Sequence, residues 1–448
     1  MIAYELQRAA EIADGVTVGN ATTRFRGMIH DSRRVVAGNL YAALPGARVD
    51  GHDFVEAARE AGASAALVAR RVDSRLAQVV VDDVERAMGA LAAEWRAARS
   101  AKVVGVTGSN GKTTVKTLLK SVLEGVGRTL ATVGNYNNEI GVPLTLAGLD
   151  EEHAFAVVEM GAGEPGDIAY LARIAAPDVG VVTNAGPAHL ERLGSIEGVA
   201  ATKGELFEEL GSEGTAVINR DDRFHDAWRN RAAPARILTF GCHAEADVRI
   251  VERDARAMLE TPAGEIPLDL ALPGRHNLMN AAAAAACALA LDVAPQRIAA
   301  GLAAVRDLPG RLRWLRRPAG GTVIDDAYNA NPGSVSAGLK VLADRPGRRW
   351  LVLGEMAELG GESDAMHRAV GREARGLGID ALFALGPRAG VAAEAFGAGG
   401  SSHESAEELL EALRAGFGDD VTCLVKGSRS ARMERIVDGL VPREDEPC

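Results

Sequence analysis

The sequence predicts an α/β protein that is divided into three domains. Its 448 residues are too many for one hydrophobic core and indicate roughly two to four domains. Hydrophobic residues make up 47% of the chain and charged residues 25%, which is the balance of a folded globular protein. Two separate series of short β-branched runs alternate with amphipathic segments, as parallel strands alternate with crossover helices.

The N-terminal region has shorter elements than the rest of the chain. Residues 39–46 indicate a strand and a turn, residues 53–63 a helix, and residues 64–70 and 77–83 two further strands. We therefore expect a small mixed domain over residues 1–82.

The central region, residues 83–308, carries the first series of apolar runs. Strands are expected at residues 102–107, 155–160, 179–184 and 215–220. An alanine-rich segment at residues 281–286 predicts a closely packed helix, which Asn277 can cap. Because ligands gather at the carboxyl ends of parallel strands, functional residues should follow each run.

The C-terminal region carries the second series, at residues 321–328, 348–356, 380–386 and 421–429. Segments that suit helices follow these runs, for example residues 405–417. The boundary is expected at Pro309 and Gly310, so that residues 309–448 form a separate Rossmann-like domain.

Charge, cysteine content and hydropathy restrict the classes of partner. A formal net charge of -11 disfavours an extended nucleic-acid surface but allows a small anionic ligand. The four cysteines form no CxxC pair, which favours a reducing compartment. The N-terminus lacks the apolar core of a signal peptide, and no apolar run reaches about 18 residues. We expect a cytoplasmic protein without integral membrane association.

The stretch "VVGVTGSNGKTTVKTLL", residues 103–119, predicts a phosphate-binding loop between a strand and a helix. Glycines allow the backbone to approach an anion, and the helix points its positive end at the same place. Lys112 would neutralise phosphate charge, and the Thr113 hydroxyl would reach a magnesium ion. The pattern is partial, since Val106 stands where the general P-loop has its first glycine, and a plain glycine-rich turn is the alternative. The predicted ligand is a nucleoside triphosphate, and the loop residues are Gly108, Ser109, Asn110, Gly111, Lys112, Thr113 and Thr114.

This variant loop resembles that of the Mur ligase family, the ATP-dependent amide-forming enzymes of peptidoglycan precursor assembly. Further segments resemble the family in the same order, at residues 132–146, 157–168, 183–207, 274–284, 325–334 and 424–434. Residues 31–55 are similar to the uridine-nucleotide-binding segment of the ligases that extend the peptide stem. The resemblance covers nearly the whole chain and implies that the central domain is a P-loop-type ATPase.

Within the family, "NYNNEIGVP" and "AYNANP" are most similar to the enzymes that add D-alanyl-D-alanine. The resemblance implies an ATP-dependent ligase that joins this dipeptide to UDP-N-acetylmuramoyl-tripeptide through an acyl phosphate. A monomer is expected. Two alternatives stay open, namely a sibling ligase that adds the third amino acid and a non-catalytic nucleotide-binding regulator.

The resemblance also implies which residues carry the chemistry. Lys112, Glu159, His189 and Lys203 would be catalytic, and Thr113, Glu159, His189 and Lys203 would hold Mg²⁺, with Lys203 carbamylated. Further nucleotide contacts would come from Asn280, Arg311, Asp326, Tyr328 and Asn329. The substrate would meet Asp31, Ser32, Arg33, Asn135 and Asn138.

Ordinary structural roles are the alternatives for several of these residues. Glu159 could be a solvated acid at a strand end, and Lys203 could be a lysine on a helix surface. Arg33 could form a simple salt bridge, and the segment around Asp326 could be only a strand end and a turn. The sequence leaves the role of Glu355 open, and it does not distinguish lysine from diaminopimelate as the third peptide residue.

Overall fold

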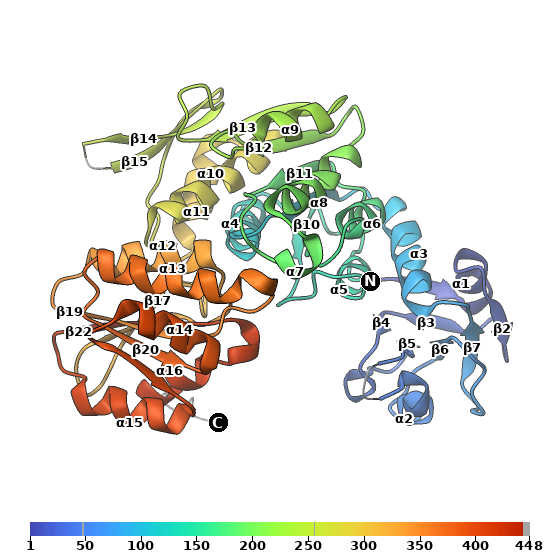
Figure 1. Cartoon of the computed structure of the whole chain (residues 1–448). Helices are drawn as coiled ribbons and strands as arrows, with labels where there is room; N and C mark the ends of the chain where they lie inside the picture. Colours follow the sequence, from blue (N-terminus) through green and yellow to red (C-terminus); the bar gives the residue numbers. More distant parts are fainter. Residues whose placement is uncertain (47–48, 255, 442–448) are drawn as a thin grey trace.

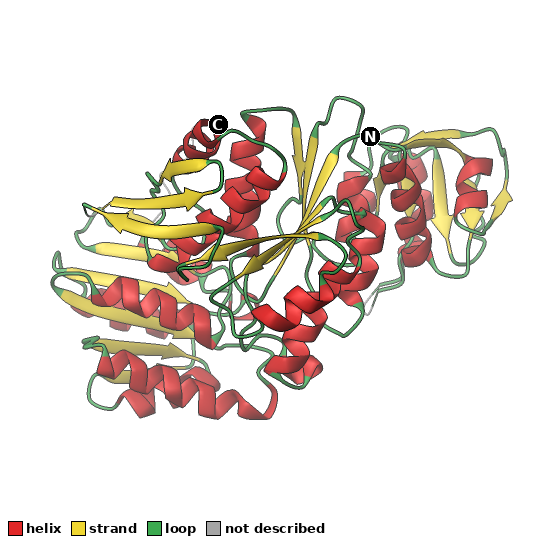
Figure 2. Ribbon diagram, turned by 90° about the horizontal axis from the view of Figure 1, so that it is seen from above, coloured by secondary structure: helices red, strands yellow, loops and turns green. Residues whose placement is uncertain are grey.

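The chain forms three successive α/β regions, each built around its own main sheet (Figures 1 and 2). The structure is a computed structural model that describes residues 1–46, 49–254 and 256–441. In Figure 1 the N-terminal region is blue, the central region runs from cyan to yellow, and the C-terminal region is orange and red. Cys242, Cys287 and Cys423 are free thiols, whereas Cys448 lies outside the described residues.

The N-terminal region contains a five-stranded sheet in the order β2-β7-β6-β5-β4, in which only the β2 pairing is antiparallel. The expected strands correspond to β5, β6 and β7. A separate pair, β1 with β3, joins the start of the chain to this region. The elements are β1 (Ala3–Glu5), α1 (Leu6–Ile12), β2 (Val16–Val18), β3 (Arg24–Arg26), β4 (Met28–Ile29), η1 (Ser32–Arg34), β5 (Leu40–Ala42), η2 (Gly51–Phe54), α2 (Val55–Glu60), β6 (Ala65–Val68) and β7 (Ala77–Val80).

The central region contains a nine-stranded sheet in the order β16-β15-β14-β13-β12-β11-β8-β10-β9. Its strands from β9 to β14 are parallel, and all four expected apolar runs lie in it. The elements are α3 (Val84–Ala97), β8 (Lys102–Thr107), α4 (Lys112–Glu124), β9 (Thr129–Ala131), α5 (Gly141–Leu146), β10 (Phe155–Glu159), α6 (Asp167–Ala175), β11 (Val179–Val182), α7 (Leu190–Leu193), α8 (Ile196–Glu208), β12 (Thr215–Asn219), α9 (His225–Arg231), β13 (Arg236–Gly241), β14 (Val248–Arg253), β15 (Arg256–Thr261), β16 (Gly264–Pro267), α10 (Arg275–Ala290) and α11 (Pro295–Ala304).

The last strands of this sheet, β14, β15 and β16, form an antiparallel meander that the sequence pattern did not predict. Figure 1 shows β14 and β15 extending away from the helices. Charged side chains pair across these strands, for example Arg253 with Glu260 and with Glu265. These strands therefore lack the continuous apolar runs that mark parallel strands buried on both faces.

Helix α10 is the expected alanine-rich helix, and residues 281–288 are fully buried. Its predicted start is wrong, because the helix begins at Arg275 and its N-cap is Gly274 rather than Asn277. Gly274 has φ +93°, a conformation that favours glycine at this position. Asn277 lies inside the first turn and donates from Nδ2 to the carbonyl of Pro273, at 2.7 Å.

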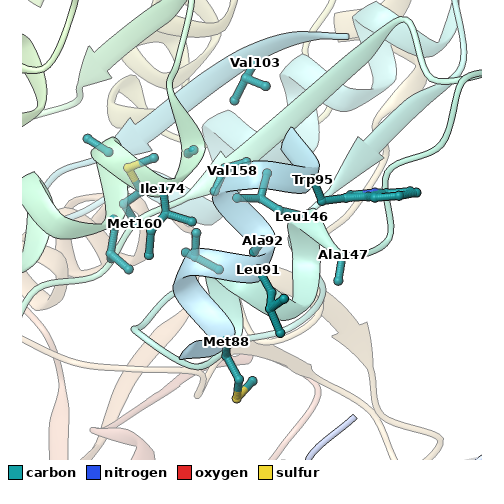
Figure 3. Packing of buried hydrophobic residues seen from close by; sticks show 14 of the residues in the cluster. Met88, Leu91, Ala92, Trp95, Val103, Leu146, Ala147, Val158, Met160 and Ile174 are labelled. Carbon is teal, nitrogen blue, oxygen red and sulfur yellow. The ribbon is translucent and has the colours of Figure 1, made fainter. Parts of the chain in front are cut away.

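Helix α3 connects the N-terminal region to the central region. Asp83 caps it by accepting from the backbone N–H of Arg86, and the helix packs on α5 and α6. Figure 3 shows Met88, Leu91 and Trp95 of α3 in this cluster of buried apolar side chains. A helix that starts at residue 84 thus contributes to the core of the central region. The domain boundary after residue 82 stays a prediction.

The C-terminal region contains a six-stranded sheet in the order β17-β18-β22-β19-β20-β21. Only the β17 pairing is antiparallel, and the four expected runs are β18, β19, β20 and β22. The elements are β17 (Arg313–Arg316), β18 (Thr322–Asp326), α12 (Pro332–Ala343), β19 (Arg348–Gly354), η3 (Gly360–Glu362), α13 (Ser363–Gly376), β20 (Ala381–Leu385), α14 (Pro387–Phe396), β21 (Gly400–His403), α15 (Ala406–Gly416), β22 (Val421–Lys426), η4 (Arg429–Ala431) and α16 (Glu434–Leu440). Among the described residues, no helix combines the length and apolarity that a membrane span requires.

The packing of α3 predicts the effect of truncating one of its buried side chains. Leu91 is fully buried, so Leu91→Ala should lower the free energy of unfolding by about 3 kcal/mol through the lost transfer energy and the cavity. Arg86→Ala on the same helix is the control, because its side chain is 78% exposed, and it should change stability by less than about 0.5 kcal/mol. Urea unfolding followed by circular dichroism measures both variants. Equal stability of the two would contradict the packing described here.

Candidate active site

A cavity of about 980 Å³ opens between the central and C-terminal regions. The central region contributes the loops that follow β8, β9, β10 and β11, and the C-terminal region contributes residues 326–331 and the start of α12. Figure 1 shows the two regions side by side. The carboxyl ends of the parallel central strands therefore form one wall of the cavity, as expected for a ligand site in an open α/β sheet.

The predicted phosphate loop has the backbone that its glycines suggest. Gly108 and Gly111 have φ values of +144° and +86°. A Cβ atom would lie 1.8 Å from Thr183 Oγ1 at the first position and 2.3 Å from Asn280 Oδ1 at the second. Larger residues would therefore clash as well as strain the backbone. Lys112 starts α4 and donates from Nζ to the carbonyl of Gly108 at 2.7 Å, so it folds back over the loop.

The segment after β11 holds the loop through several hydrogen bonds. Ser109 Oγ bonds to the carbonyl of Gly186 at 3.0 Å, and the Asn110 N–H donates to Asn184 Oδ1 at 3.0 Å. Thr183 Oγ1 donates to the carbonyl of Asn110 at 2.5 Å. Sequence reasoning did not single out Thr183 or Asn184, although both belong to the segment that resembles the family.

Glu159 ends β10 and is 2% exposed, so its alternative interpretation as a solvated acid is wrong. Its carboxylate accepts from Thr113 Oγ1 at 3.0 Å and from Asn137 Nδ2 at 2.8 Å, and it pairs with Lys116 Nζ at 3.1 Å. Burial alone would raise the pKa of Glu159, but Lys116, Lys112 and the Asn137 hydrogen bond hold it below its ordinary value. The site thus contains an ionised carboxylate beside the Thr113 hydroxyl.

Lys116 is a site residue that sequence reasoning missed. It lies one helical turn after Lys112 on α4, so the two side chains share a face of the helix. This spacing was the available signal. Burial lowers the pKa of Lys112 below its ordinary value, with Arg311 adding to the effect and Glu159 opposing it.

Lys203 on α8 is 1% exposed, so its alternative interpretation as a surface lysine is wrong. Its amine makes no hydrogen bond or salt bridge within the described residues, and it does not line the cavity. Burial, together with the charge of Lys112, lowers the pKa of Lys203 to about 7. A large share of this amine is therefore neutral, and hence nucleophilic, near neutral pH.

His189 precedes α7 and lines the cavity in a left-handed conformation, with φ +55°. Its Nδ1 lies 2.5 Å from Oε2 of Glu358 in the C-terminal region. The hydrogen bond with His189 lowers the pKa of Glu358. Sequence reasoning did not identify Glu358 as a site residue. Across the described residues, no three His, Cys, Asp or Glu side chains gather as a metal site. Of the four predicted metal ligands, only Thr113 and Glu159 are in direct contact with each other.

The predicted nucleotide residues of the C-terminal region reach the cavity. Arg311 donates from Nη2 to Thr113 Oγ1 at 2.8 Å, and its guanidinium lies 4.3 Å from the ring centre of Tyr328. Asp326 is buried and pairs with Lys426 at 2.5 Å. These residues line the cavity together with Asn280, Asn329 and Lys426. Sequence reasoning did not single out Lys426, although it lies in the segment at residues 424–434 that resembles the family.

The predicted substrate residues fall into two groups. Asn135 and Asn138 line the cavity, whereas Asp31, Ser32 and Arg33 lie at η1 in the N-terminal region and do not. Arg33 forms the salt bridge that was its alternative interpretation, with two contacts of 2.9 Å to Asp31. This pairing with Arg33 lowers the pKa of Asp31 to about 2. The two groups are connected where Arg34 donates to the hydroxyl of Tyr136, at 3.1 Å.

The glycine geometry of the loop predicts a loss of nucleotide binding on substitution. In Gly111→Ala the new methyl group meets Asn280, so the affinity for a fluorescent ATP analogue should fall at least about tenfold. Gly125→Ala, at the other end of α4, is the matched control, since φ is -72° and the nearest atom lies 3.3 Å away. Titration of both variants with the fluorescent ATP analogue measures the two affinities. Unchanged affinity in Gly111→Ala would remove the loop from the nucleotide site.

Three family models match the chain, in the order expected for three domains. They are the Mur ligase family, catalytic domain, at residues 24–96, the Mur ligase middle domain at residues 106–288, and the Mur ligase, glutamate ligase domain, at residues 310–429. A curated relative from Escherichia coli (strain K12), UDP-N-acetylmuramoyl-tripeptide--D-alanyl-D-alanine ligase, is 39% identical and aligns over 100% of both chains.

Solved structures show the same architecture. The crystal structure of MurF from Acinetobacter baumannii is 34% identical, with a TM-score of 0.92 over 98% of this chain and 99% of that chain. MurF ligase from Thermotoga maritima in complex with ADP is 29% identical, with a TM-score of 0.81 over 93% and 97%. The expected α/β fold, with a parallel-sheet central domain and a Rossmann-like C-terminal domain, is confirmed. The chain belongs to the Mur ligase family.

Proposed function

We infer that this protein uses ATP to join D-alanyl-D-alanine to UDP-N-acetylmuramoyl-tripeptide in peptidoglycan precursor synthesis. The observation that carries the inference is the cavity in which a phosphate loop, a buried carboxylate and several cations converge between two domains. The full-length relatives bear the name of this activity. The reaction has to bring a substrate carboxylate to a triphosphate, and such a meeting of anions requires concentrated positive charge.

The nucleotide is assigned to the phosphate loop and to the C-terminal wall of the cavity. The N–H groups at the start of α4 would point at the phosphate chain, and Lys112 and Arg311 would add positive charge there. Asn280, Asp326, Tyr328 and Asn329 are proposed to contact the ribose and the base. A relative that was solved in complex with ADP supports nucleotide binding by this fold.

The residues present fit a magnesium ion. Thr113 supplies a hydroxyl and Glu159 an ionised carboxylate in contact with it, and Mg²⁺ typically takes one or two carboxylates together with substrate phosphates. Bound there, Mg²⁺ would offset the negative charge of the phosphates. His189 is the proposed protein ligand for a second ion, through Nε2, because its Nδ1 is the atom that pairs with Glu358.

Lys203 is proposed to be carbamylated. Its neutral amine would attack dissolved carbon dioxide, forming an N–C bond and releasing a proton, so that the side chain ends in a carboxylate-like group. The lowered pKa supports this change, and so does the absence of a hydrogen bond or salt bridge to the amine among the described residues. Burial makes the ammonium form costly, and attraction to Glu205 offsets only part of that cost. The product would supply the anionic group that a metal ion requires of a protein ligand.

The chemistry then follows in two steps. The terminal carboxylate of the tripeptide attacks the γ-phosphorus of ATP, forming an acyl phosphate as ADP leaves. The amino group of D-alanyl-D-alanine attacks the acyl carbon, losing a proton and expelling inorganic phosphate. Lys112 and Arg311 stabilise the charge that spreads over the transferring phosphoryl group. Enclosure of the acyl phosphate between the two domains would limit its hydrolysis by water.

The UDP end of the substrate is assigned to Asp31, Ser32 and Arg33, and the peptide end to Asn135 and Asn138. Because the Arg33 side chain is 87% exposed, its guanidinium is accessible to a diphosphate despite its pairing with Asp31. The contact between Arg34 and Tyr136 links the two parts of this path. We also propose a monomeric protein of the cytoplasm.

The first prediction for this function concerns the substrates that turnover requires. Release of inorganic phosphate should need ATP, Mg²⁺, UDP-N-acetylmuramoyl-tripeptide and D-alanyl-D-alanine together, because the acyl phosphate waits for an amine. Free D-alanine should fail as nucleophile. A phosphate-release assay with each component omitted in turn checks this.

The same assay separates the alternatives. A sibling ligase would instead turn over with a UDP-muramoyl dipeptide and a diamino acid. A regulator without activity would bind ATP and release no phosphate under any combination. Equal ATP hydrolysis without the peptide substrates would refute the ligase function.

A second prediction concerns Lys203. Lys203→Ala should fold normally but lose roughly 10- to 100-fold in rate, as removal of a group that supports a metal site typically does. Acetate or formate in excess should restore part of the rate by occupying the vacated space. Lys120→Ala is the matched control, because Lys120 is a partly exposed lysine that pairs only with Glu124 among the described residues, and it should keep the wild-type rate. Wild-type turnover in Lys203→Ala would exclude the residue from the site.

A further inference from the structure

A hydrogen bond joins the C-terminal region directly to the middle of the phosphate loop. Asn331 donates from Nδ2 to Oδ1 of Asn110 at 2.8 Å, across 221 positions of the sequence. Asn331 is 8% exposed. Neither the motif analysis nor the proposed reaction assigns it a role.

The orientation of the Asn331 amide is fixed by the helix that it starts. Asn331 is the N-cap of α12, where Oδ1 accepts from the Ser334 N–H at 2.9 Å, while its own N–H donates to Ser334 Oγ at 3.0 Å. This reciprocal pair is a capping box. Because the amide oxygen serves the helix, the amide nitrogen is the end that faces the loop.

Asn110 is held on its other side by the central sheet. Its N–H donates to Asn184 Oδ1 at 3.0 Å, and its carbonyl accepts from Thr183 Oγ1 and Asn184 Nδ2. The Asn110 side-chain oxygen therefore completes a chain from the end of β11, through the loop, to α12. In the described part of the protein, Asn331 is the only hydrogen-bond partner of that oxygen.

We propose that Asn331 is a positioning residue through which the docked C-terminal domain sets the phosphate loop for phosphoryl transfer. The proposal rests on the proposed ligase function. Thr183 and Asn184 hold the loop backbone without help from the C-terminal domain, so nucleotide binding does not depend on Asn331. The contact with Asn331 holds the side chain of Asn110, whose backbone is already held, and small misplacements at a reacting centre lower the rate of the chemical step.

Among the described residues, Arg311 makes the other side-chain hydrogen bond between the C-terminal region and the loop, at Thr113, but it carries a charge. Asn331 is neutral and contacts the loop rather than the cavity cations. Its effect is therefore on geometry, and it should change kcat rather than the affinity for the nucleotide.

The test compares two helix caps. Asn331→Ser retains an N-cap residue for α12, since serine caps helices well, but its hydroxyl is too short to reach Asn110. We expect kcat to fall about tenfold, while the Kd for ADP and the KM for ATP change less than about twofold. Ser405→Ala removes the N-cap of α15, far along the chain from the site, and should lower Tm without changing kcat.

A double-mutant cycle with Asn110→Ala measures the coupling. Asn331→Ser should add nothing to the loss in kcat caused by Asn110→Ala, because the hydrogen bond is already absent. Wild-type kcat in Asn331→Ser, an equal loss of ADP affinity, additive losses in the double variant, or the same kcat loss in Ser405→Ala would each overturn the proposal. Failure of the wild-type protein to use D-alanyl-D-alanine would instead refute the ligase function.

Discussion

The buried carboxylate of Glu159 is the group on which the central site depends. A carboxylate that is 2% exposed is stable in its ionised form only when hydrogen bonds and a cation compensate it. Lys116 and Thr113 of α4 and Asn137 of the loop after β9 provide this compensation. These contacts fix the position of α4 against β10. The phosphate loop lies between β8 and α4, so its geometry follows from the same contacts.

Sheet topology explains why one cavity serves two domains. The parallel order of β8, β10 and β11 brings the loops that follow them to one edge, and β18 and β22 do the same in the C-terminal domain. The two edges face each other, so Arg311 and Asn331 contact the loop while Glu358 contacts His189. Neither domain alone supplies all the side chains that line the cavity. The proposed reaction therefore requires the two domains to be docked.

Local features were predictable from sequence where a short pattern determines them. The apolar runs predicted the parallel strands correctly. The glycines, together with Lys112 and Thr113, predicted the loop between β8 and α4 that the structure contains. The burial of Lys203 had no such pattern, because α8 is covered by both α6 and α9 and tertiary packing decides it. Lys426, Glu358 and Asn331 reach the site only through docking of the C-terminal domain. The cap predicted at Asn277 was wrong because Gly274 starts the helix earlier.

The acyl phosphate is the central claim of the proposed chemistry, and the fate of oxygen tests it most directly. The substrate for this test is UDP-N-acetylmuramoyl-tripeptide with ¹⁸O at both oxygens of its terminal carboxylate. It would be turned over with ATP and D-alanyl-D-alanine, and the released phosphate would be analysed by mass spectrometry. Attack of the carboxylate on the γ-phosphorus transfers one labelled oxygen, so the released inorganic phosphate should contain one ¹⁸O atom per molecule. Product formation with unlabelled phosphate would contradict the mechanism.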